Sequence, residues 1–198
     1  MIEAALVTIL PVGFLIVLFG GGVVFLKRKI KQDGEAPINR TLFYLSKYSI
    51  LVLWGAMVLQ SWGINISFVD VPQALQIIAL LFWVCGFAFM YLGRFTMRDS
   101  FRLGTPKEDT SLRTDGLFRI SRNPMYVGVY LTIAASTLYT TNPLVILTGV
   151  FVIAVHHRIV RAEEKHLWNV FGREYSEYCS RVSSISNLKC AGFFNRTN

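Results

Sequence analysis

The stretch AALVTILPVGFLIVLFGGGVVFL, residues 4–26, contains no charged side chain. It is long enough to cross a bilayer as a helix, which takes about 20 residues. Three further stretches are similar: residues 41–69, in which Lys47 is the only charge, residues 71–93 and residues 123–157. The chain is 53% hydrophobic and 16% charged, whereas soluble domains are about 45–50% apolar and about 25% charged. These patterns predict an integral membrane protein and exclude a disordered chain, a collagen or a coiled coil.

All 20 lysines and arginines lie outside or at the edges of these stretches, in residues 27–47, 94–122 and 158–196. If three spans and a final hairpin alternate across the bilayer, the three basic clusters face the same side. The positive-inside rule makes that side cytoplasmic and places the N-terminus and residues 65–70 outside. Because the charge of +8 flanks membrane spans, we expect the lipid bilayer as the partner and no nucleic acid.

The chain is expected to form a single membrane domain over residues 1–198. The predicted fold is all-α, with three long transmembrane helices, a helical hairpin that makes five spans in all, and a C-terminal amphipathic cytoplasmic helix. The predicted segments are helices at 4–26, 41–62 and 71–93, a hairpin at 123–157 that turns at 140–143, an amphipathic helix from 158 to 182, and a polar tail at 183–198. Gly172 is expected to break or bend the amphipathic helix.

The densest polar constellation lies where the hairpin begins and ends. It consists of Arg122, Asn123, Pro124, Met125 and Tyr126 on entry, and of Arg158, Arg161, Glu163 and Glu164 on exit. A hairpin returns its end to its beginning, so the two groups are expected to be neighbours.

This constellation suits an anionic or zwitterionic ligand. Asn123 is expected to cap the helix and Pro124 to occupy its first position. The resulting helix N-terminus attracts a carboxylate, an arginine can pair with it bidentately, and a glutamate can accept from an amine or a ribose hydroxyl. A structural alternative stays open, in which these residues are flanking charges that form ion pairs at helix ends.

No metal site is expected. Glu163 and His166 form half of a di-iron bundle motif whose second copy is absent, and the adjacent His156 and His157 cannot share a helix face. The three cysteines form no C-x-x-C pair.

Two sequence blocks resemble those of the integral-membrane methyltransferases, the superfamily of isoprenylcysteine carboxyl methyltransferases and phospholipid methyltransferases. The first block is GLFRISRNPMYVG at residues 116–128, and the second is RAEEKHL at 161–167 followed by FGREYSEY at 171–178. The family's corresponding patterns read approximately G-hydrophobic-aromatic-x-x-x-R-H-P-x-Y-x-G, R-x-E-E-x-x-L and F-G-x-x-Y-x-x-Y. The resemblance covers the C-terminal third of the chain.

The resemblance implies methyl transfer from S-adenosylmethionine to a lipophilic acceptor, such as a prenylcysteine carboxylate or a lipid-like molecule, at the cytoplasmic membrane face. The catalytic region would then be residues 94–182, which include a cofactor-binding loop. The implied cofactor-binding residues are Thr110, Ser111, Leu112, Arg113, Phe118, Arg122, Asn123, Pro124, Met125, Tyr126, Glu163 and Glu164. Arg158 or Arg161 would hold or orient the acceptor, and Glu163 or Glu164 would act as base for an amine acceptor.

The sequence departs from the family pattern at two positions. Asn123 stands where the family has a histidine, and Ile159 stands where the carboxyl methyltransferases have an arginine. Two other functions therefore stay open. One is an NADPH-dependent membrane reductase of the sterol reductase type, which shares an asparagine-proline-x-tyrosine motif; the other is a non-catalytic lipid-binding membrane scaffold.

Overall fold

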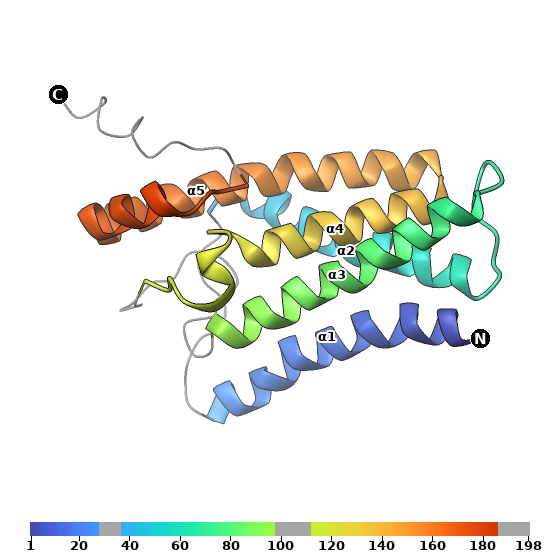
Figure 1. The fold of residues 1–198 in the computed structure, drawn as a ribbon, viewed down its shortest axis with the longest axis horizontal. Coiled ribbons are helices and arrows are strands. Elements are labelled where there is room, and N and C mark those ends of the chain that lie inside the picture. Colours follow the sequence, from blue (N-terminus) through green and yellow to red (C-terminus); the bar gives the residue numbers. More distant parts are fainter. Residues whose placement is uncertain (28–36, 98–111, 186–198) are drawn as a thin grey trace.

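The computed structural model describes residues 1–27, 37–97 and 112–185, and within these ranges the regular structure is entirely helical. Its elements are α1 (Ile2–Lys27), α2 (Arg40–Ser61), α3 (Gln73–Met97), the 3-10 helix η2 (Gly116–Arg119), α4 (Pro124–Thr140) and α5 (Pro143–Arg181). The long helices lie side by side in one bundle, with the N-terminus and the α4–α5 turn at the same end (Figure 1). We call the opposite end, where α3 ends and α4 begins, the site end.

The three predicted N-terminal helices are confirmed, with shifted boundaries. α2 begins at Arg40 because Asn39 caps it, its side-chain oxygen accepting from the backbone N–H groups of Thr41 at 3.0 Å and Leu42 at 3.3 Å. α3 begins at Gln73, after Pro72, and continues to Met97. Capping and proline set both starts.

The predicted hairpin turn is also confirmed. α4 ends at Thr140, and Thr141 adopts a left-handed conformation with φ of 43°. Asn142 then caps α5 by accepting from the N–H of Leu144 at 2.9 Å, and Pro143 occupies the first helical turn. Turn-forming residues between two apolar halves therefore set the hairpin, as the sequence indicates.

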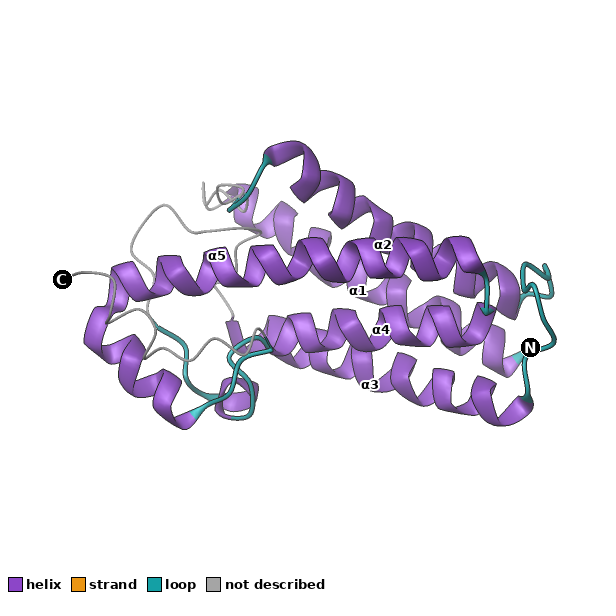
Figure 2. Cartoon of the chain, turned by 90° about the horizontal axis from the view of Figure 1, so that it is seen from above, coloured by secondary structure: helices purple, strands orange, loops and turns teal. Residues whose placement is uncertain are grey.

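The predicted separation between the hairpin and a C-terminal helix is wrong. α5 continues past His157 and is interrupted only at Gly172, whose φ of 46° and ψ of −113° are not helical. Beyond this bend the last segment folds back toward η2 (Figure 2). There Tyr175 and Tyr178 pack around Phe118, and the Tyr178 hydroxyl donates to the Phe118 carbonyl at 2.6 Å. The aromatic side chains of this amphipathic segment therefore pack on the bundle.

The bundle has the dimensions and surface of an integral membrane protein. Within the described ranges α1, α2, α3 and α5 are long and apolar enough to cross a membrane, and α4 has 17 residues. Large apolar side chains are exposed on the outer faces, among them Ile16, Val52, Leu81 and Leu147. In water such a surface would aggregate, whereas lipid tails solvate it.

The closest helix contact in the core is between α3 and α4. A Cβ atom added at Gly86 would lie 2.9 Å from the carbonyl oxygen of Gly128, and one added at Gly128 would lie 2.6 Å from that of Gly86. The two backbones thus touch through paired glycines, a packing mode typical of helices in membranes. This contact fixes α4, whose first turn carries the predicted site residues.

We predict that Gly86→Ala destabilises the protein, because the added methyl group has to displace the backbone of α4. Overpacking of this kind costs about 1–3 kcal/mol. Gly55→Ala in α2 is the matched control, since nothing lies within 4 Å of its added Cβ. The measurement is the thermal unfolding midpoint of both variants in one detergent. Equal midpoints would contradict the close approach of α3 and α4.

Candidate functional site

The two ends of the hairpin meet at the site end through a buried ion pair. Arg122, which precedes α4, donates from Nε to the Oε1 oxygen of Glu164 on α5 at 3.1 Å, and each side chain is only 3% exposed. The Nδ2 group of Asn123 donates to the same oxygen at 3.0 Å. The expectation that these two groups are neighbours is therefore confirmed.

The chain beyond α5 completes this polar cluster. The backbone N–H of Arg122 donates to the Ser183 carbonyl at 3.0 Å, and its Nη1 group donates to the Val182 carbonyl at 3.1 Å. Asn123 Nδ2 also donates to the Ser184 hydroxyl at 2.9 Å. Ser183 and Ser184, the first residues of the predicted polar tail, therefore belong to this cluster.

Asn123 occupies the expected N-cap position of α4, and Pro124 follows at the first helical position. The Asn123 side chain makes no capping hydrogen bond, contrary to prediction, because it is turned toward Glu164 and Ser184. The first N–H groups of α4 therefore lack a side-chain cap, which leaves them and the positive end of the helix dipole available to an anion.

Glu163, one residue before Glu164, has a different environment. Its Oε1 oxygen accepts from the Tyr126 hydroxyl at 2.8 Å. Burial raises the pKa of Glu163 to about 7, against the lowering effect of that hydrogen bond, and the charge of Glu164 adds to the increase. A carboxyl group with this pKa changes its charge near neutral pH and responds strongly to a nearby cation.

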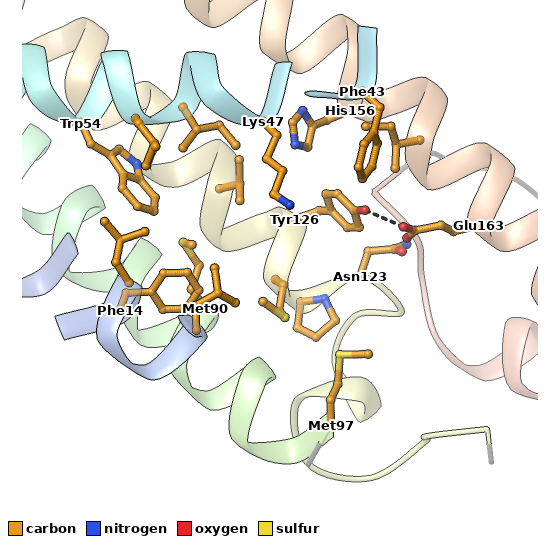
Figure 3. A pocket seen from close by; sticks show the side chains of 18 of the residues that line it. Phe14, Phe43, Lys47, Trp54, Met90, Met97, Asn123, Tyr126, His156 and Glu163 are labelled. Carbon is orange, nitrogen blue, oxygen red and sulfur yellow. Dashed lines mark hydrogen bonds between the residues drawn. The ribbon is translucent and has the colours of Figure 1, made fainter. Parts of the chain in front are cut away.

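A cavity of about 290 Å³ extends from Glu163 and Tyr126 into the bundle (Figure 3). At its site end the lining includes polar side chains such as Asn123, whereas Phe14 and Trp54 line the part farther inside (Figure 3). All five α-helices contribute, and η2 contributes Phe118. The cavity therefore joins a polar compartment, suited to a zwitterionic ligand, to an apolar one, suited to a lipophilic ligand.

The structure brings seven of the fourteen predicted site residues to this cavity. Those that line it are Phe118, Arg122, Asn123, Pro124, Met125, Tyr126 and Glu163. Glu164 is buried behind them in its ion pair, and Arg158 and Arg161 are exposed on α5. Leu112 packs beside Phe118, and Arg113 is half-buried near the same segment of chain. Thr110 and Ser111 lie outside the described residues.

Several lining residues are not predicted from the sequence. Lys47 reaches the cavity from α2, and His156 reaches it from α5 with its Nδ1 atom 2.8 Å from the Ser46 hydroxyl. Ile159, where the family resemblance implies an arginine, also lines the cavity. The signal for Lys47 was present in the sequence, as the only charge between residues 41 and 69. Over the ranges that the structure describes, no three His, Cys, Asp or Glu side chains cluster as a metal site.

The chain that forms this fold and this cavity matches a family of methyltransferases. The family model described as "Phospholipid methyltransferase" matches residues 71–174, which is more than half of the chain, and the chain belongs to this family. The chain is also similar to a methanethiol S-methyltransferase of Pseudomonas deceptionensis, with 29% identity over 165 residues. That alignment covers 76% of this chain and 60% of the relative, so the chain spans less than two thirds of the relative's length.

We predict that Glu164→Ala destabilises the protein strongly, because it leaves the Arg122 guanidinium buried without its carboxylate. Breaking one side of a buried pair costs about 3–5 kcal/mol. The matched control is Glu177→Ala, which breaks the pair with Arg173 on the same helix, where the side chains are 93% and 61% exposed. Exposed pairs contribute at most about 1 kcal/mol. Thermal unfolding in one detergent measures both, and similar midpoints would rule out a structural role for Glu164.

Proposed function

We propose that the protein transfers a methyl group from S-adenosylmethionine to a lipophilic acceptor at the cytoplasmic face of the membrane. The observation that carries this proposal is the cavity, in which Asn123, Tyr126 and Glu163 form a polar end and Trp54 belongs to an apolar interior. A methyltransferase of this kind has to hold one polar and one apolar substrate next to each other, and membership of the phospholipid methyltransferase family agrees with it.

The residues at the polar end fit the donor. S-adenosylmethionine brings a methyl group that is already activated on a positively charged sulfonium, together with an amine and a carboxylate. The uncapped start of α4 suits the carboxylate, and Glu163 suits the positive charge. Tyr126 fixes the position of the Glu163 carboxylate. With an activated donor, the main work of the protein is to align the two substrates and to exclude water.

We propose different roles for the two adjacent glutamates. Glu163 lines the cavity and is proposed to bind the donor, whereas Glu164 lies behind it and holds Arg122 and Asn123 in place. Arg158 and Arg161 are exposed on α5, where contact with lipid headgroups or an arriving acceptor suits them better than contact with the donor.

The lining of the cavity supports a proposal for the acceptor. Apolar side chains dominate the interior of the cavity, and they favour a hydrophobic acceptor that arrives from the bilayer. The relative is named for methyl transfer to methanethiol, which shows that a thiol can be the acceptor in a similar protein.

We further propose five spans, α4 included, with the site end cytoplasmic and the N-terminus outside, because the basic clusters then share the cytoplasmic side.

Calorimetric titration of the detergent-purified protein tests the donor. We expect saturable binding of S-adenosylmethionine, weakened about tenfold by Glu163→Gln and a few-fold by Tyr126→Phe, because a charged contact and a neutral hydrogen bond are lost. Glu177→Gln, at an exposed position on the same helix, is the control and should bind normally. Binding of NADPH alone would instead indicate the membrane reductase, and binding of neither would leave the non-catalytic scaffold.

The affinity for the donor should also depend on pH. In the free protein Glu163 has a pKa of about 7, and the positively charged donor binds to its ionised form. Lowering the pH from 8 to 6 protonates this carboxyl group, and the affinity is expected to fall about tenfold. Titrations of Glu163→Gln over the same range remove the contribution of the ligand's own ionisation. An equal pH dependence in both proteins would disprove the assignment of Glu163.

A further inference from the structure

Lys47 places a positive charge within the apolar part of the site. It lies on α2 with Phe43, Ile50 and Trp54, and their spacing of three and four residues puts all four on one helix face. All four line the cavity, and Figure 3 shows the Lys47 side chain extending from α2 into it. The other three residues are apolar, so Lys47 carries the single charge among the four residues of this cavity-lining face.

A lysine within an apolar segment is costly. Charged residues are rare in transmembrane helices, and those that occur usually have a function. The Lys47 Nζ atom lies 5.9 Å from the Phe43 ring centre and 5.8 Å from that of Tyr44, and such cation–π contacts recover part of the cost. They do not explain why the side chain lines a cavity that also contains Glu163.

Three charged side chains line the cavity, those of Lys47, Arg122 and Glu163. Arg122, which precedes α4, forms the ion pair with Glu164, and Glu163 on α5 accepts a hydrogen bond from Tyr126 on α4. Lys47 comes from α2 (Figure 3). The cavity therefore presents a carboxylate from one helix, suited to a cation, and an ammonium from another helix, suited to an anion.

We propose that Lys47 binds the anionic nucleophile of the acceptor, so that the substrates are apolar carboxylic acids or thiols in their ionised form and not amines. This inference rests on the proposed methyl transfer and specifies its acceptor. The apolar chain of the acceptor lies along Phe14 and Trp54, and its anionic group lies near Lys47. An alkylammonium would be repelled by the same side chain.

The reaction balances without a base in the site. The acid or thiol loses its proton to solvent before the transfer. A lone pair of the resulting carboxylate or thiolate then forms the bond to the methyl carbon, while the bond from that carbon to the sulfonium sulfur breaks and leaves its electron pair on the sulfur. Lys47 holds the anion in position and stays protonated throughout.

A binding experiment without donor tests the proposal. The probes are 11-bromoundecanoate and its uncharged methyl ester, whose bromine quenches tryptophan fluorescence when the chain enters the cavity. The full chain is reconstituted in zwitterionic lipid nanodiscs with Trp62→Phe and Trp168→Phe, so that Trp54 and Trp83 in the core report. Trp54→Phe, with Trp83 retained, shows how much of the quenching comes from the cavity.

We expect Lys47→Met to weaken binding of the carboxylate about tenfold and to change binding of the ester less than twofold. Lys47→Arg should retain most of the affinity, and Lys165→Met, at an exposed lysine of α5, should behave as the unmodified chain. Equal losses for the acid and the ester would indicate a structural role for Lys47 and overturn the proposal. So would an unchanged affinity for the acid.

Competition in the unmodified chain keeps the proposal testable if Lys47→Met does not fold. Undecanoate should displace the bromoundecanoate, and its uncharged methyl ester should displace it about tenfold more weakly; equal displacement by the two would overturn the proposal. Product analysis with undecanoic acid and undecanethiol then distinguishes a methyl ester from a thioether. If S-adenosylmethionine does not bind but the Lys47-dependent binding of the acid persists, the methyl transfer fails and the anion site stands.

Discussion

The arrangement of the site depends on the buried ion pair between Arg122 and Glu164. It joins the loop before α4 to α5 across 42 residues of sequence, in a place where both side chains are 3% exposed. Desolvation of two charges is expensive, and further hydrogen bonds are needed to offset it. Asn123 donates one to Glu164, and the Val182 carbonyl accepts one from Arg122. The return of the chain over the cluster after α5 places that carbonyl there.

Helix geometry makes the two adjacent glutamates different. Successive residues of an α-helix point about 100° apart, so Glu164 turned toward Arg122 leaves Glu163 turned toward the cavity and Tyr126. One carboxylate is held in a permanent ion pair, and the other is available to a ligand. A pair of glutamates in sequence thus provides both the support for the site and the group that is proposed to bind the donor.

Much of the fold follows from local sequence patterns. Uncharged stretches predict the helices, the residues around Asn142 predict the turn, and Gly172 predicts the bend. The hairpin topology is also sufficient to bring Tyr126 and Glu163 together. The partners of Asn123 cannot be read in this way, because Ser184 lies 61 residues away and contacts it only through the return of the chain. Such contacts depend on tertiary packing, which no local pattern encodes.

The sequence marks Lys47 of α2 as an isolated charge, but it does not show that this residue belongs to the site, because its neighbours there lie far along the chain. Lys47 and Phe43 line the cavity with His156 and Glu163 of α5, although the resemblance to the family covers only the C-terminal third. The residues proposed to bind the donor, Asn123, Tyr126 and Glu163, belong to the α4–α5 hairpin, whereas the space proposed for the acceptor is bounded by α1, α2 and α3 as well. Proteins that share the hairpin can therefore differ in acceptor through substitutions in their N-terminal helices, where the sequence reads only as membrane span.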